Sequence, residues 1–292
     1  MASLDGKTLL FIGGVPRSGT TWTQLLLAAH PDIASGRETH IFGRYVNRMF
    51  EIYRKERDEN QADGLSKYFD RAEYTEVIIK GIVTATLEKI ADRKPEARVV
   101  LEKTPSNIWN TRMIRKLFGR QARFLHIVRD PRSVYASLKA ASSEDWGDWA
   151  DMTPEAFAHR WVGAQLRAAG ARDLFGEGYR EIAYETLRAD PHATMKAACD
   201  WLGILADEAT IAAAVDQNDL ARLKTQTRTD DKADPAQETR ANFFRTGKTD
   251  GWKSELTGAE IEAIERIAAE PMAALGYRPA HEQGRPAVQQ PG

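Results

Sequence analysis

The chain contains one cysteine, Cys199, among its 292 residues. A single cysteine cannot form a disulfide within the chain, which excludes the small secreted domains that depend on a disulfide framework. Cys199 lies on a helical pattern (194–202), where we expect it to be a small buried hydrophobic residue. This cysteine usage is typical of a reducing compartment, and we predict a cytoplasmic location.

The chain also lacks an excess of charge and lacks long apolar runs. Its 41 Lys and Arg residues nearly balance its 42 Asp and Glu residues, giving a formal net charge of −1. A near-neutral chain is not a general nucleic-acid binder, so anion recognition must come from local clusters. The run at 9–12 is too short for a signal peptide, and no run approaches the ~20 residues of a membrane span. We expect no nucleic-acid partner and no transmembrane segment, and nothing in the sequence predicts the oligomeric state.

A glycine-bounded loop follows the first apolar run. Gly14 and Gly19 have the spacing of the first half of the phosphate-binding pattern G-x-x-x-x-G-K-[ST]. Such loops turn backbone N–H groups at a helix N-terminus toward an anion. Thr20 stands where that pattern has its Lys, and Arg17 is the only cation in the loop. The loop therefore predicts a site for an anionic nucleotide without the usual grip on β- and γ-phosphates.

Strand and helix patterns alternate along the chain, which predicts an α/β protein with a mostly parallel sheet flanked by helices. We expect one domain over 1–280 and a Pro/Gln-rich disordered tail over 281–292. The expected strands are 8–13, 98–101, 123–128 and 179–183. The expected helices are 20–29, 41–57, 73–92, 107–118, 131–141, 154–171, 186–202, 208–215 and 257–269, with a polar loop at 30–39 and a charged loop at 225–239.

Two further clusters combine cations with other polar groups. Arg129 ends an expected strand, and Ser137 follows eight residues later, about two helical turns on. Both could reach one phosphate; alternatively, Arg129 pairs with Asp130 and Ser137 is an ordinary helix residue. The segment 243–253 brings together cations, glycines and aromatics that could wrap a phosphate, or that form a solvated basic turn anchored by Trp252.

Taken together, the three clusters resemble the sulfotransferase family, whose donor is 3′-phosphoadenosine 5′-phosphosulfate (PAPS). The segment 16–22 resembles that family's loop for the 5′-phosphosulfate, and Arg129 with Ser137 resembles its 3′-phosphate pair. The residues Arg245, Thr246 and Gly247, followed by 251–253, resemble its C-terminal phosphate loop, although Thr246 replaces a Lys. The resemblance covers about 9–253 and implies the P-loop NTPase-like sulfotransferase fold.

Within the family, the first forty residues are most similar to tyrosylprotein and Golgi glycan sulfotransferases. The spacing from the loop to Glu38 matches the tyrosylprotein enzymes, in which the matching Glu is the proposed base. The segment 102–105 resembles a Lys-containing segment of the same enzymes, and its form Glu-Lys-Thr-Pro is closer to the heparan-type sulfotransferases. Trp22 is closer to the cytosolic small-molecule enzymes, in which that Trp packs on adenine. The mixture leaves the acceptor open: a small molecule, a glycan, a lipid or a phenol.

The resemblance and the residue types together imply an in-line displacement at sulfur. Glu38 would take the proton of an acceptor hydroxyl, with His40 as the alternative base. Arg17 and Lys103 would stabilise charge on the transferring group, unless Lys103 forms an ion pair with a nearby acid. The expected nucleotide contacts are Arg17, Ser18, Gly19, Thr20 and Thr21 for the 5′-phosphate, Trp22 and Tyr184 for adenine, and Arg129, Ser137, Arg245, Thr246 and Gly247 for the 3′-phosphate. PAPS is the expected co-substrate, PAP the product, and no metal is required.

Two other functions remain open from the sequence. A P-loop kinase or NTPase would need a Lys after Gly19, where Thr20 stands, and a strand-end Asp for Mg²⁺, for which Asp130 is the best candidate. An inactive nucleotide-binding protein is the other alternative. The presence of Arg17, Glu38 and Lys103 argues against a loss of activity.

Overall fold

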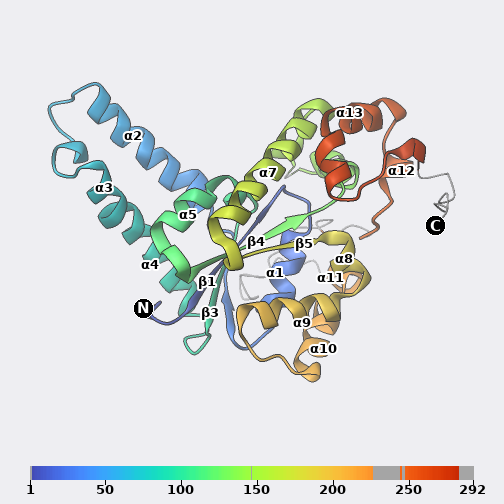
Figure 1. Ribbon diagram of the computed structural model, residues 1–292, viewed down its shortest axis with the longest axis horizontal. Coiled ribbons are helices and arrows are strands. Elements are labelled where there is room, and N and C mark those ends of the chain that lie inside the picture. The colour runs from blue at the N-terminus through green and yellow to red at the C-terminus, as the bar shows by residue number, and fades with distance from the viewer. Residues whose placement is uncertain (1, 146, 226–243, 245–246, 283–292) are drawn as a thin grey trace, which may run out of the picture. The chain divides into compact units, whose positions relative to one another are not determined.

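The computed structural model describes residues 2–145, 147–225, 244 and 247–282 (Figure 1). These residues form two compact units, which we describe separately. The first unit contains the chain up to Val128 together with 167–247. The second contains 129–166 and the chain from Lys248 onward.

The first unit is built on a parallel sheet of five strands in the order β2-β3-β1-β4-β5. This confirms the predicted α/β class and the parallel sheet. The central strand β1 is buried from Leu9 onward because it is covered on both faces, as its unbroken apolar sequence requires. The strands are β1 (Thr8–Gly14), β2 (Ile33–Ser35), β3 (Val99–Lys103), β4 (Ala122–Val128) and β5 (Tyr179–Ala183).

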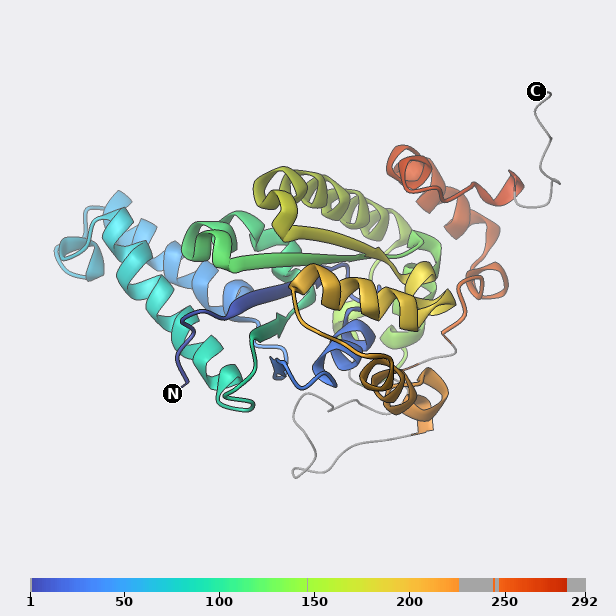
Figure 2. The same cartoon turned by 60° about the horizontal axis from the view of Figure 1, so that its bottom comes forward.

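Alternate residues of the strands feed two separate cores. On one face, residues such as Leu10 and Leu125 pack with α1 (Thr20–Ala28) and α9 (Pro191–Leu202). On the other face, Phe11 stacks on Phe118 of α5 (Thr111–Phe118) at 6.0 Å between ring centroids. Figure 2 shows α1 and α5 on opposite sides of the sheet. Cys199 is fully buried in the first of these cores, as predicted.

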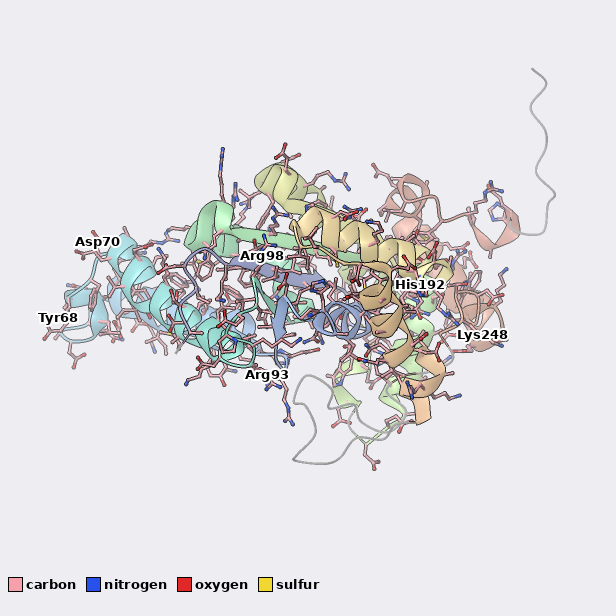
Figure 3. All side chains as sticks on the ribbon, turned by 90° about the horizontal axis from the view of Figure 1, so that it is seen from below. Tyr68, Asp70, Arg93, Arg98, His192 and Lys248 are labelled. Atoms are coloured by element: carbon pink, nitrogen blue, oxygen red, sulfur yellow. The ribbon has the colours of Figure 1, made fainter. Side chains whose placement is uncertain are left out.

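A helical arm leaves the sheet after β2 and returns to β3 (Figure 1). Stacking of Tyr53 on Tyr74, with centroids 4.2 Å apart, joins its outgoing and returning halves. Asp70 caps the returning half through a capping box, and it lies with Tyr68 at the tip of the arm (Figure 3). The arm consists of η1 (Ile41–Val46), α2 (Asn47–Asp58), η2 (Leu65–Lys67), α3 (Arg71–Glu73), η3 (Tyr74–Ile79) and α4 (Lys80–Ala91).

The second unit is helical. It contains α6 (Pro131–Ser142), the start of α7 (Pro154–Phe175), α12 (Trp252–Glu255) and α13 (Gly258–Ala274). Thr257 and Glu260 form the predicted capping box at the start of α13. The fully buried Arg132 of α6 forms ion pairs with Asp130 and with Glu265 of α13, so one guanidinium holds two helices together.

Two local predictions are wrong. The polar segment 30–39 contains the short edge strand β2, which the sequence does not reveal because only three residues pair with β3. The segment 186–202 is not one helix: α8 (Tyr184–Ala189) ends before Pro191, and Asp190 caps the new helix α9 through a bond from the Ala193 amide. A proline at the first position of a helix favours such a restart.

The remaining expected elements lie close to their predicted bounds. The segment 107–118 begins as the 3₁₀ turn η4 (Pro105–Asn110) before α5, and α10 (Glu208–Gln217) is followed by α11 (Leu220–Thr225). Thr225, the first residue of the loop predicted at 225–239, belongs to α11, and the rest of that loop and the tail beyond 282 lie outside the described residues. Within the described ranges, no helix is both long enough and apolar enough to cross a membrane.

Candidate active site

The glycine-bounded loop connects β1 to α1 as predicted. Arg17 and Gly19 adopt positive φ angles of 75° and 99°, and the Ser18 amide donates to the Val15 carbonyl at 3.1 Å. A side chain at Gly14 would place Cβ 2.4 Å from the Ile127 carbonyl oxygen, so only glycine fits there. The first turn of α1 has no acidic residue and no side-chain cap. Its N-terminal N–H groups and its positive dipole end therefore suit an anion.

Two buried aromatic rings meet at the start of α1. The Trp22 and Tyr184 rings contact edge to face, with centroids 5.9 Å apart. The Trp22 indole N–H donates to the Asn218 carbonyl at 2.8 Å, and the Tyr184 hydroxyl donates to the Gly247 carbonyl at 3.4 Å. A Cβ on Gly19 would lie 2.4 Å from the Tyr184 ring. The structure thus brings Trp22, Tyr184, Gly19 and Gly247 together, as the predicted nucleotide site requires.

Glu38, Lys103, Thr21 and His40 converge at the carboxyl end of β3. The Lys103 ammonium is buried and forms an ion pair with Glu38. It also donates to the Thr21 hydroxyl of α1 at 3.0 Å. The other oxygen of the Glu38 carboxylate lies 3.3 Å from His40 Nε2. The Lys103 ammonium therefore contacts both Glu38, the predicted base, and α1, the helix that follows the glycine-bounded loop. The ion pair with an acid that we expected as the alternative for Lys103 is formed with Glu38.

The electrostatics of this cluster determine the charge of His40. Burial lowers the pKa of His40 below its ordinary value, and Arg44 and Lys103 act in the same direction. Glu38 and Glu102 act in the opposite direction without restoring the ordinary pKa. His40 is consequently neutral at pH 7, so one of its ring nitrogens can accept a proton.

Sequence reasoning missed Glu102, which is 1% exposed at the end of β3. Its carboxylate accepts hydrogen bonds from Thr39, Thr104 and Asn107. The available signal was a carboxylate inside a strand, Val-Val-Leu-Glu-Lys, that is otherwise apolar up to that point. Charged residues are rarely buried without a specific role or partner.

In the second unit, Arg129 and Ser133 hold the segment that follows Gly247. The Arg129 guanidinium donates to the Lys248 carbonyl at 3.0 Å, and the Ser133 hydroxyl donates to the Thr249 carbonyl at 2.7 Å. Ser137 lies one turn beyond Ser133 on α6 and is 6% exposed. Arg245 and Thr246, predicted to contact the same phosphate, lie outside the described residues.

Asp130 is engaged as a structural group. Its carboxylate caps α6 through the Arg132 amide at 2.9 Å and forms a bidentate pair with the Arg132 guanidinium at 3.0 and 2.6 Å. The Arg132 guanidinium also lies 4.0 Å from the centroid of the Trp252 ring. A carboxylate fixed in this way is a poor candidate for the Mg²⁺ ligand of an NTPase. Trp252 is accordingly buried and anchors this segment.

The first unit has an anion-suited loop between a parallel strand and a helix, with ionisable side chains at the same sheet edge. These features define a P-loop protein of the α/β class. A family model described as "Sulfotransferase family" matches residues 10–208, and a second, described as "Sulfotransferase domain", matches residues 178–276. The chain belongs to the sulfotransferase family.

Similar curated proteins carry the name protein-tyrosine sulfotransferase. Protein-tyrosine sulfotransferase 2 of Gallus gallus is 35% identical over 131 residues, which are 44% of this chain and 33% of the chicken protein. Protein-tyrosine sulfotransferase A of Caenorhabditis elegans is 26% identical over 208 residues, which are 68% of this chain and 50% of the nematode protein. The chain thus spans between a third and half of the length of these relatives.

Solved structures show the same fold. The sulfotransferase domain of the Synechococcus PCC 7002 olefin synthase superposes with a TM-score of 0.58 at 21% identity, covering 95% of this chain and 98% of that domain. Mouse sulfotransferase SULT7A1, complexed with PAP, superposes with a TM-score of 0.59 at 16% identity, covering 91% of this chain and 85% of the mouse chain. The family predicted from the three motifs is confirmed, and the role of each site residue remains a prediction.

Proposed function

We propose that this protein transfers the sulfuryl group of PAPS to an acceptor hydroxyl. The observation that carries the proposal is the contact of Lys103 with both Glu38 and Thr21. Through these contacts Lys103 connects Glu38, a carboxylate that can accept a proton, with α1, the helix whose N-terminus suits a phosphate. Family membership supports sulfuryl transfer, and the mouse structure with PAP supports a nucleotide of the PAPS type.

The donor, when bound, supplies the sulfuryl group, and its 5′-phosphate oxygen leaves as part of PAP when the bond to sulfur breaks. The backbone N–H groups of Gly19, Thr20 and Thr21 at the N-terminus of α1, together with the hydroxyls of Ser18, Thr20 and Thr21, bind the 5′-phosphate. Lys103 and Arg17 stabilise negative charge that develops beside this loop during transfer. Lys103 and Arg17 thereby supply the positive charge of the Lys that Thr20 replaces. A sulfuryl group carries less charge than a γ-phosphoryl group and needs fewer cations.

Glu38 is the proposed base. Its carboxylate, 31% exposed, has one oxygen on Lys103 and the other near His40, and it accepts the proton of the acceptor hydroxyl as that proton becomes acidic in the transition state. His40 is the alternative base, because its lowered pKa leaves it neutral at pH 7. Its contact with Glu38 also suits an orienting role.

The remaining nucleotide contacts are proposed from the motifs and from the local packing around them. Trp22 and Tyr184 line the adenine side, where their mutual contact forms an aromatic wall. Arg129 and Ser137 bind the 3′-phosphate. The hydrogen bond from Arg129 to the Lys248 carbonyl supports this assignment, because it places Arg129 beside the segment that follows Gly247. Arg245, Thr246 and Gly247 are proposed as further contacts to that phosphate. We also propose that no metal is required and that the protein works in the cytoplasm.

The acceptor is proposed only as a hydroxyl of a small molecule, a glycan, a lipid or a phenol. The names of the curated relatives make a tyrosine peptide the first acceptor to test. Exposed aromatic side chains occur along the arm, with Tyr45 and Tyr68 at 53% and 81% exposure, and could pack on an acceptor.

A transfer screen tests the proposal. The purified protein is incubated with PAPS and with tyrosine peptides, phenols, sugars and lipids, and mass spectrometry detects a sulfated product. We expect a sulfated acceptor without added metal. Mg²⁺-dependent hydrolysis of ATP with no sulfated product would favour a kinase or NTPase, and tight PAP binding with no transfer would favour an inactive nucleotide-binding protein.

A further inference from the structure

The segment 38–40, called the corner below, carries the proposed base and has an unfavourable backbone conformation at His40. His40 has a φ of 51°, in the left-handed region that costs a non-glycine residue about 1 kcal/mol. Glu38 and His40 flank Thr39, so the position of the base depends on how this corner is held. A strained corner persists only where its surroundings determine it.

Glu102 supplies that restraint. One oxygen of its carboxylate accepts from the Thr39 hydroxyl at 2.8 Å, from the Thr39 amide at 3.3 Å and from the Thr104 hydroxyl at 2.6 Å. The Thr104 hydroxyl in turn accepts from the His40 amide at 3.2 Å. Both residues that follow the base are therefore tied, directly or through one hydroxyl, to a single buried carboxylate.

Glu102 and Lys103 grip successive residues of the corner from one strand. Neighbouring residues of a strand point to opposite faces of the sheet. Lys103 reaches Glu38 and α1 on one side, whereas Glu102 reaches Thr39 on the other. The end of β3 thus holds Glu38 and Thr39 between two adjacent side chains.

The partners of Glu102 within the described part of the chain are uncharged hydroxyl and amide donors. Hydrogen bonds to an ionised acceptor are roughly twice as strong as neutral ones, and buried ones are costly to lose. The second oxygen accepts from Asn107 Nδ2 at 2.5 Å, and the same amide donates to the Ile12 carbonyl at 3.1 Å. This links the corner to β1, the strand that leads into the phosphate-type loop.

We propose that Glu102 is a positioning residue that fixes Glu38 for proton transfer by holding the Thr39–His40 corner. The inference rests on the proposed function, because it assumes that Glu38 is the base. It predicts that loosening the corner lowers kcat while donor binding at the loop is unchanged.

Thr39→Val is the sharpest variant, because it removes the hydroxyl that binds Glu102 and leaves every charge in place. Glu102→Gln also changes the field at His40 and disturbs Asn107, so it serves as the second variant. Thr86→Val is the matched control. The Thr86 hydroxyl also makes a 2.8 Å bond, to the Ile82 carbonyl in α4, and is similarly half-buried.

The first readout is the NMR titration of the His40 imidazole, which needs no acceptor. Burial is the main cause of the lowered His40 pKa, so release of the corner should raise the pKa toward its ordinary value. We expect a rise in Thr39→Val and no change in Thr86→Val. An unchanged His40 titration in Thr39→Val would overturn the inference, whatever the enzyme's activity proves to be.

The second readout is a double-mutant cycle for transfer from PAPS to a tyrosine peptide. Thr39→Val should lower kcat about 10-fold with an unchanged Kd for PAP, because misplacement of a reacting group lowers the rate without affecting distant binding. In a Glu38→Gln background the same change should cost less than about 2-fold, since the two residues act as one unit. A 10-fold loss in both backgrounds would contradict the inference. A Glu38→Gln enzyme with wild-type kcat would instead reject the proposed base.

Discussion

Two buried charged residues, one in each compact unit, are stabilised in different ways. In the second unit, Arg132 is enclosed by two carboxylates and an aromatic ring, so positive charge meets negative charge within 2.6 Å. In the first unit, the equally buried Glu102 is surrounded by hydroxyl and amide donors. A matched ion pair fastens helices together, whereas a carboxylate with several directional donors sets the orientation of the groups that donate to it.

Backbone strain follows the same division. The non-glycine residues with positive φ in the described chain, Arg17, His40 and Asn60, all belong to the first unit. Arg17 and His40 lie in the two loops that carry the predicted chemistry. Strained residues that cluster in this way are typical of functional sites, where the surrounding contacts hold them. In the first unit these contacts therefore orient side chains of the predicted site, whereas the contacts of Arg132 in the second unit hold helices together.

The largest effect is expected at the proposed base. Glu38→Gln should lower kcat by about 10²–10⁴-fold, the usual contribution of general base catalysis, while PAP still binds. Transfer rates measured by mass spectrometry and PAP binding measured by calorimetry check both parts. A near-wild-type kcat would show that Glu38 is not the base and would favour His40 in that role. The orientation of Glu38 in the first unit would then have no catalytic consequence.

Loss of the buried cation in the second unit should affect stability more than any exposed charge does. Arg132→Met leaves the carboxylates of Asp130 and Glu265 without their partner, at a cost of about 3–5 kcal/mol in the free energy of unfolding. Urea denaturation measures this cost. Lys139→Met is the control: it breaks the exposed pair with Glu260 and should change stability by no more than about 1 kcal/mol. Equal effects of the two variants would show that Arg132 is not an anchor.

The loop glycine tests the strained side of the comparison. Gly19→Ala places a Cβ at a φ of 99° and against the Tyr184 ring, and we expect a loss of about 1–3 kcal/mol in stability together with weaker PAP binding. Thermal denaturation and calorimetry measure the two effects. Gly276→Ala is the matched control, since it has a φ of 79° but an open Cβ position. PAP affinity should fall only for Gly19→Ala.

The smallest effect concerns Glu181 on β5, a half-buried carboxylate whose side chain is 22% exposed. Burial acts to raise its pKa, but hydrogen bonding and charge from His126, 3.0 Å away, lower it overall. A carboxyl whose folded pKa is depressed stabilises the protein above its unfolded pKa of about 4.3, and this contribution disappears as pH falls through the folded pKa. Glu181→Gln should therefore cost about 1 kcal/mol at pH 7 and less at pH 3.

Denaturant titrations at several pH values check this dependence. Glu177→Gln, at an exposed position just before β5, is the control and should show the same pH dependence as the wild type. A cost of Glu181→Gln that stays constant down to pH 3 would mean that Glu181 is not held ionised by its neighbours.

Local patterns predicted the loop, the parallel sheet and most helices because each depends on residues that are close in sequence. The spacing of Gly14 and Gly19 is such a pattern, and so is the capping box at Thr257 and Glu260. The edge strand β2 was missed because its three residues are ordered by pairing with β3, more than sixty positions away. Glu102 was missed for a related reason: Asn107 is its near neighbour, but Thr39 comes from a distant loop.

The sequence by itself determined the family and the chemical groups of the candidate site. These follow from patterns of neighbouring residues, namely the glycine-bounded loop that lacks a Lys and the motifs around Glu38, Lys103 and Arg129. Only the tertiary structure decided how these groups are paired. The register of β1 against β3 places Lys103 between Glu38 and Thr21 and turns Glu102 toward Thr39. Such pairings arise between segments far apart in the chain, where the distance between two side chains depends on the packing of the whole sheet.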